Sequence, residues 1–220
     1  MKQAAKGIKT GFLQGLREYL KENYHASVFD QASKSKEPYD FYLHGHRIVR
    51  AVVGKNLKYN LRLYSDKAGE MHLPKTDVKL LYPAASSEAV GPLIRVDKKV
   101  RDLDLEPIIS ARKRYHIKNK SLFPLMKERR VLFFTLLEGE VVKGIVSDFS
   151  RYEITVSLKG GVPVVILRHG VYDVRDKKGR CFLKSFQEIH RDWEKSELFV
   201  SGDTPFYAVR PVVFRKIPQP

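Results

Sequence analysis

The sequence predicts a mainly β fold with α extensions: two tandem small β-barrels, each preceded by a short helix. Residues 152–158 alternate apolar and polar side chains, which is the period-two pattern of a half-buried strand. A weaker form of this β-pattern, headed by a glycine, begins at Gly45, 94 positions before its counterpart Gly139. Related β-units at a fixed offset indicate an internal repeat; two unrelated β-meanders are the alternative interpretation.

Helices are expected before each β-unit. Residues 10–24 place apolar side chains at helical spacing between charges, and a second, shorter helix is expected around residues 28–36. Before the later unit, residues 121–130 predict a helix with Ser121 as its N-cap and Pro124 in or next to its first turn. Each helix thus leads directly into strands.

Glycine, proline and small polar residues separate these units. Residues 84–92 end in Gly-Pro and are interpreted as a linker, followed by a short strand near residues 93–96. Inside the later unit, Gly144 is expected to mark a bend or a close approach of two backbones, because glycine weakens a flat strand. The domains assigned are the N-terminal helical extension (1–27), the first barrel (28–83), the linker and basic segment (84–118), the second barrel (119–175), and the C-terminal helix and tail (176–220).

The C-terminal part is expected to be a helix followed by an edge strand or docking tail. Phe182, Phe186, Ile189 and Trp193 form one apolar stripe at helical spacing, and residues 205–217 carry a strand-like pattern. The single cysteine, Cys181, excludes an intrachain disulfide and fits a reducing compartment; we interpret it as a small core side chain.

The charge balance points to a polyanionic partner. The chain has 41 Lys and Arg against 25 Asp and Glu, a formal net charge of +16, and an excess of this size favours nucleic acid over a neutral ligand. No apolar run approaches the roughly 20 residues that span a bilayer, and the N-terminus lacks a secretory apolar region. A cytoplasmic protein without membrane attachment is expected.

Residues 119–174 resemble the bacterial RNA chaperone Hfq of the Sm-like superfamily. The segment "KERR" at 127–130 is similar to the basic end of that family's N-terminal helix, "EGEVVKGIVSDFSRYEI" is similar to its first Sm motif, and "LRHGV" is similar to its second. The first repeat resembles the family more distantly, with Lys75 matching a lysine and Thr76 standing where the histidine would be. The resemblance implies two Sm-like units, and because Hfq-type rings contain six, a homotrimer that forms a pseudo-hexameric ring.

The resemblance also implies the residues that bind single-stranded, uridine-rich RNA. Tyr152 and Tyr59 occupy positions similar to the family's stacking phenylalanine, and stacking needs such exposed π-faces; packing in the barrel is the alternative role. Arg151 and Lys58 precede them. Arg168 and His169, with Lys75 in the first repeat, correspond to the pore-side contacts, although His169 could instead bond a neighbouring subunit. Because Thr76 replaces the histidine in the first repeat, Tyr152 is expected to matter more than Tyr59.

A cluster of basic residues between 110 and 130 predicts a surface for nucleic acid rather than an ordinary solvated face. We call this cluster the basic rim; it contains Arg112, Lys113, Arg114, Lys118, Lys120, Lys127, Arg129 and Arg130. Glu128 is the only acid among them. Of the rim, Lys127, Arg129 and Arg130 are the candidate RNA ligands. On the other face of the ring, Thr135 replaces the family's stacking tyrosine, and Phe41 is expected to serve in the first repeat.

No catalytic constellation stands out, so the chain is not expected to be an enzyme or to need a cofactor or metal. His44 and His46 form the nearest approach to a ligand pair, but without a third ligand they are interpreted as surface residues. Two functions therefore remain: a post-transcriptional regulator of the RNA-chaperone class, or an architectural or scaffolding protein whose Sm folds only oligomerise while its basic extensions bind DNA or protein. Binding of U-rich RNA against duplex DNA distinguishes them.

Overall fold

The structure, a computed structural model, describes residues 2–183 and is mainly β with several helices. The first half of the chain begins with two helices, α1 (Lys2–Asn23) and α2 (Val28–Ser35). Its strands are β1 (Pro38–Leu43), β2 (Arg47–Asn56), β3 (Asn60–Ser65), β4 (Gly69–Pro74) and β5 (Val78–Pro83), with a 3-10 turn (Lys75–Asp77) between the last two.

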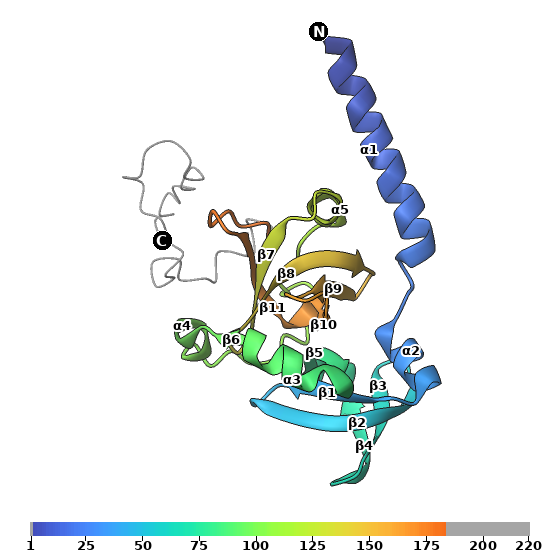
Figure 1. Cartoon of the computed structure of the whole chain (residues 1–220), viewed down its shortest axis with the longest axis vertical. Coiled ribbons are helices and arrows are strands. Elements are labelled where there is room, and N and C mark those ends of the chain that lie inside the picture. The colour runs from blue at the N-terminus through green and yellow to red at the C-terminus, as the bar shows by residue number, and fades with distance from the viewer. Residues whose placement is uncertain (1, 184–220) are drawn as a thin grey trace, which may run out of the picture.

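The second half repeats this order. Its elements are α5 (Asn119–Lys127), β7 (Val131–Leu136), β8 (Glu140–Phe149), β9 (Glu153–Ser157), β10 (Pro163–Leu167), a 3-10 turn (Arg168–Gly170) and β11 (Val171–Asp176). Between the halves lie a 3-10 turn (Ala84–Ser86), α3 (Ser87–Val90), a further 3-10 turn (Gly91–Leu93), β6 (Arg95–Val96) and α4 (Lys98–Arg101). The expected linker is therefore a series of short helical turns, as Figure 1 shows. None of the described helices is both long and apolar enough to span a bilayer.

All eleven strands belong to one antiparallel sheet, and the expectation of two closed barrels is wrong. The order is β11-β7-β8-β9-β10-β5-β1-β2-β3-β4, with β6 beside β8. The halves join where β10 pairs with β5, through Val165 opposite Leu81 and Ile166 opposite Leu80. An unpaired edge strand leaves backbone N–H and C=O groups without partners. At this junction the edge strand of each half pairs with the edge strand of the other, so one sheet continues through both halves.

The two halves are related by a constant offset of 93 residues, since β1 begins at residue 38 and β7 at residue 131. The offset of 94 that the sequence suggested from Gly45 and Gly139 is therefore too large by one residue. His46, rather than Gly45, is the counterpart of Gly139, and both have positive φ angles, 54° and 88°. A tight turn therefore occupies the same place in each half; in the first half Gly45, φ 76°, precedes His46 in it.

The apolar faces form two cores, one mainly from each half, and the junction strands β5 and β10 contribute side chains to both. In the second half Ile154 and Val156 on β9 are fully buried, as their alternation predicts. Gly144 on β8 marks a close backbone approach, which confirms the prediction: a β-carbon there would overlap the Ser157 carbonyl and the Val156 side chain. Leu16 of α1 and Leu122 of α5 join this core, whereas α2 covers the core of the first half.

Two local expectations about the helices are corrected. Helix α5 begins at Asn119, so Ser121 lies inside it and does not cap it; Lys118 holds the N-cap position without a side-chain hydrogen bond. Pro124 lies inside α5, where an apolar face that packs against β8 outweighs the missing N–H.

Cys181 is half-buried, and its Sγ lies 3.3 Å from Asp173 Oδ1.

The expected C-terminal helix after Phe182 and the edge strand at 205–217 lie outside the described residues, which end at 183.

Candidate nucleic-acid interface

The two tyrosines that the sequence predicts to stack on RNA bases lie at equivalent turns of the two halves. Tyr59 follows β2 and Tyr152 follows β8, and their side chains are 71% and 57% exposed. Both turns are closed in the same way: Leu57 N–H donates to the Asn60 carbonyl, and Ser150 N–H donates to the Glu153 carbonyl. Closing the turn directs the two middle residues outward. Packing in the core, the alternative role for these turn tyrosines, does not occur.

A cation lies over each turn tyrosine. The Arg151 guanidinium is 5.0 Å from the centre of the Tyr152 ring, and the Lys58 ammonium is 5.1 Å from the centre of the Tyr59 ring. Arg151 also lies 5.9 Å from the ring of Tyr24, just after α1. A base stacked on either tyrosine would therefore carry its phosphate close to a positive charge.

Lys75 remains beside its tyrosine. Its backbone N–H donates to the Tyr59 carbonyl at 2.9 Å, and its ammonium donates to the Lys58 carbonyl at 3.4 Å. Partial burial lowers the pKa of Lys75, but a nearby Asp30 opposes that change. The first half thus places Tyr59, Lys58 and Lys75 together.

Arg168, the counterpart of Lys75, is withdrawn from the surface. Its backbone N–H makes the same bond, to the Tyr152 carbonyl at 2.9 Å. Its side chain, however, lies 5.6 Å from the ring of Phe149 and donates to the Ile117 carbonyl. Burial lowers the pKa of the Arg168 guanidinium to about 10, partly opposed by Tyr19 and Tyr24. The Arg168 side chain is therefore half-buried and directed toward Phe149 and Ile117.

His169 contacts the first half. Its Nε2 lies 2.8 Å from the Val78 carbonyl oxygen, which can only accept, so the neutral ring donates from Nε2. Burial, assisted by the positive charge of Arg114, lowers the pKa of His169 to about 4. The histidine therefore stays uncharged at neutral pH and bonds the neighbouring unit, which here belongs to the same chain.

The basic rim is mostly exposed. Lys127 lies 5.4 Å from the ring of Phe123, and Arg130 donates to Glu128 at 2.6 Å on the surface. Arg129 ends α5 with a left-handed backbone, φ 49°. Arg114 is the exception, because its guanidinium donates to the Ile108 and Ile109 carbonyls. Most of the rim thus remains accessible to phosphate, whereas Arg114 has a structural role.

The sequence prediction missed the equivalent cations of the first half. Lys36 ends α2 as Arg129 ends α5, also with a positive φ, 58°, and Lys34 is the counterpart of Lys127 at the 93-residue offset. Both lysines are exposed. Alignment of the two helix ends at the corrected offset reveals them. Phe41, which was expected to stack a base on the other face of the ring, is fully buried, so it cannot do so.

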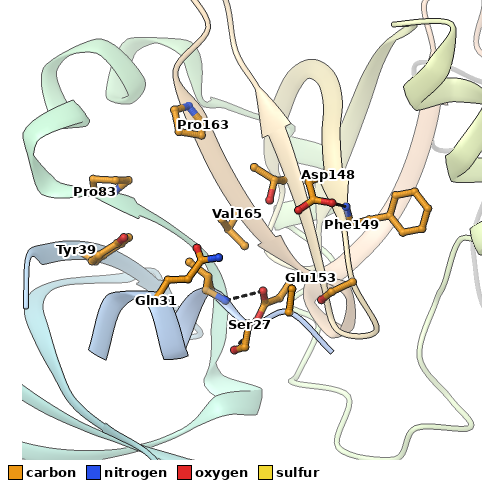
Figure 2. A pocket seen from close by; sticks show the side chains of 13 residues that line it. Ser27, Gln31, Tyr39, Pro83, Asp148, Phe149, Glu153, Pro163 and Val165 are labelled. Atoms are coloured by element: carbon orange, nitrogen blue, oxygen red, sulfur yellow. Dashed lines mark hydrogen bonds between the residues drawn. The ribbon is translucent and has the colours of Figure 1, made fainter. Parts of the chain in front are cut away.

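A pocket of about 170 Å³ lies between the halves (Figure 2). The Glu153 carboxylate points toward the start of α2, where it accepts from Val28 N–H at 2.8 Å and from Ser27 Oγ at 3.0 Å. Burial raises the pKa of Glu153. Asp148 also lines the pocket, while its Oδ1 accepts from the Phe149 N–H. The charged side chains lining it are acidic, so this pocket does not suit phosphate.

Comparison of the chain with protein-family models, with curated proteins and with solved structures found no match.

Proposed function

We propose that the chain is an Sm-like RNA-binding protein that binds U-rich single-stranded RNA and acts as an Hfq-type chaperone in post-transcriptional regulation. The observation that supports this most is the pair of exposed turn tyrosines, each with a cation 5.0 or 5.1 Å from its ring. Single-stranded nucleic acid is bound by aromatic faces for the bases and positive charge for the backbone. The net charge of +16 supplies positive charge for the RNA backbone over the whole chain.

The arrangement of each half also supports an Sm-like assignment. A short helix precedes the strands in both halves, and neighbouring units pair through edge strands at the β10–β5 ladder. Such pairing is what the resemblance to Hfq implies between the units of a ring. The roles of the residues follow this proposal: Tyr59, Tyr152, Lys58, Arg151 and Lys75 contact RNA. The proposal leaves out Arg168 and His169, because their side chains contact Phe149 and the Val78 carbonyl.

Comparing three nucleic acids at one salt concentration tests this function. U-rich RNA is expected to bind more tightly than A-rich RNA, because Phe41 is buried and the purine face lacks its aromatic platform. Duplex DNA is expected to bind weakest, since its bases are already stacked. Preferred binding of duplex DNA would favour the alternative, an architectural protein, and would contradict the proposal.

Assembly provides an independent prediction: native mass spectrometry at micromolar concentration is expected to show a homotrimer, which completes a ring of six units. The end strands β4 and β11 are the edges left for pairing between chains. On β11 the Val174 carbonyl already accepts from Phe182 N–H, so ring closure requires residues 181–183 to move aside. A monomer at this concentration would remove the ring and leave RNA binding to the single chain.

Arg129 allows stability and RNA binding to be separated. Its left-handed backbone favours glycine, so Arg129→Gly is expected to raise the free energy of unfolding by about 1 kcal/mol. If the side chain contacts one phosphate, the same change should reduce the log–log salt slope of RNA binding by about 0.7. Arg129→Lys is the matched control and should change neither. Urea unfolding and RNA titration measure the two effects; unchanged RNA binding in Arg129→Gly would exclude this rim contact.

A further inference from the structure

The turn between β1 and β2 meets the turn between β7 and β8 at the junction of the halves. His44 and His46 come from the first turn, Glu138 from the second, Glu140 from the start of β8, and Lys79 from β5. We call these five residues the junction cluster. Sequence reasoning assigned His44 and His46 to the surface for want of a third ligand; the fold brings two carboxylates to them from more than 90 positions away.

The distances within the junction cluster suit one small cation. His44 Nδ1 lies 3.5 Å from Glu138 Oε1, and His46 Nδ1 lies 3.6 Å from Glu138 Oε2. Among the described residues, one ligand atom each from His46, Glu138 and Glu140 all lie within 4.8 Å of one another. Two ligand atoms that share a tetrahedral zinc ion at ~2.1 Å lie about 3.4 Å apart. Only small side-chain movements are therefore needed to close a coordination shell.

Buried polar atoms without partners point to a missing ligand. His44 is 6% exposed; its Nδ1 faces Glu138 Oε1 at 3.5 Å, and its Nε2 has no hydrogen-bond partner among the described residues. Glu140 is 7% exposed, and its Oε2 also has none. A buried polar atom left unpaired costs free energy. His44 does not fit the surface role expected from sequence, and it is oriented toward the Glu138 carboxylate.

The charges of the junction cluster leave one negative charge uncompensated. The Lys79 ammonium contacts both Glu138 and Glu140, so one cation faces two carboxylates. Glu138 also accepts from Gly45 N–H at 2.6 Å and from His46 N–H at 3.1 Å, which fixes the orientation of its carboxylate.

We infer that the junction cluster binds one divalent transition-metal ion of the zinc class through His46, Glu138 and Glu140, with His44 beside Glu138. Imidazole nitrogen and carboxylate oxygen together are typical ligands of zinc, whereas calcium and magnesium prefer oxygen alone. Lys79 contacts one oxygen of each carboxylate and balances part of their charge. His46 is 56% exposed and gives the ion a route from solvent. Because the ligands come from both halves, the ion ties the two halves together, independently of the proposed RNA binding.

Zinc titration of the full, untagged chain tests this site. One ion per chain is expected to bind saturably, to raise the melting temperature, and to be removed by a chelator with reversal of that rise. His46→Ala should weaken zinc binding at least tenfold without unfolding the apo protein, because His46 is exposed. Glu140→Gln should weaken binding similarly while preserving side-chain volume.

His72→Ala is the matched control, because His72 is 57% exposed and lies 3.5 Å from Glu70 outside the junction cluster. It should bind zinc as the wild type does. Cobalt(II) gives a second measurement, since nitrogen and oxygen coordination produces visible absorption that His46→Ala should reduce and His72→Ala should retain. Absence of saturable binding, or equal binding by the His46 and His72 variants, would overturn the inference and leave the junction cluster a purely internal ion network.

Discussion

Replacing Lys79 by methionine is expected to lower the free energy of unfolding by about 3–5 kcal/mol. Lys79 is fully buried, and its ammonium contacts the carboxylates of Glu138 and Glu140. Methionine fills a similar volume but leaves both carboxylates without their cation. Removal of one partner of a buried ion network leaves charge that is neither solvated nor paired. Urea unfolding at neutral pH, with a chelator present, measures the loss.

Two variants separate charge from side-chain length. Lys143→Met changes an exposed lysine on β8 that lies 5.5 Å from the ring of Phe133, and it should alter stability by less than about 0.5 kcal/mol. Adding Glu138→Gln and Glu140→Gln to Lys79→Met removes the unpaired charges and should recover part of the lost stability. A Lys79→Met protein as stable as Lys143→Met would show that the junction cluster does not hold the halves together.

The importance of this cluster follows from the shortness of the strand junction. The β10–β5 ladder contains two residue pairs, Val165 with Leu81 and Ile166 with Leu80, whereas β1 and β2 pair over six. Few backbone bonds therefore connect the halves. Polar contacts across this boundary come from the junction cluster, from the His169 bond to the Val78 carbonyl, and from the Glu153 carboxylate, which accepts from Ser27 and Val28.

The second large effect is expected at the turn tyrosines. Tyr59→Ala and Tyr152→Ala should each weaken U-rich RNA binding by about 1–3 kcal/mol, the typical contribution of one stacked base. Both rings are more than half exposed, so truncation should leave no cavity and should change the melting temperature little. RNA titration and thermal unfolding of the same samples measure the two properties together.

The relative size of the two losses differs from the sequence expectation. Tyr152 was expected to dominate because His169 is retained beside it and Thr76 replaces the histidine in the first half. His169 instead bonds Val78, and the half-buried Arg168 side chain contacts Phe149 and the Ile117 carbonyl, so neither side chain is directed to a base on Tyr152. Lys75 remains beside Tyr59. We now expect a loss in Tyr59→Ala at least equal to that in Tyr152→Ala.

Phenylalanine variants are the matched controls for stacking. Tyr59→Phe and Tyr152→Phe keep the π-face and should retain most RNA affinity, whereas Lys58→Gln and Arg151→Gln should lower the salt dependence by removing charge. A loss in the phenylalanine variants equal to that in the alanine variants would attribute the effect to the hydroxyl group and contradict stacking.

Local patterns predicted the elements of the fold well, because they depend on neighbouring residues. The alternation around Ile154 and Val156 predicted a strand whose apolar face is buried, and Gly144 predicted a close backbone approach. The start of α5 was missed because Ser121 is a favourable cap in sequence, yet the helix extends to Asn119. Local propensity did not decide that boundary.

Contacts between distant segments could not be predicted in this way. The single sheet depends on β10 meeting β5, and the junction cluster depends on two turns meeting at that point. Arg168 carries the motif that favours an RNA contact, but its side chain donates to the carbonyl of Ile117, 51 positions earlier. Periodicity and spacing contain no signal for which helix covers which strand. The sequence likewise did not determine whether Tyr59 and Tyr152 are exposed, because their exposure depends on the geometry of the turns.

The most direct test of RNA recognition is a titration of U-rich RNA and duplex DNA with wild-type protein and with the Tyr59→Ala/Tyr152→Ala double variant, at matched salt. The account predicts tighter wild-type binding to the RNA, a loss of RNA affinity in the double variant of about 2–6 kcal/mol if the two sites add, and an unchanged melting temperature. Tighter binding of duplex DNA by the wild type, together with unchanged RNA affinity in the double variant, would contradict it.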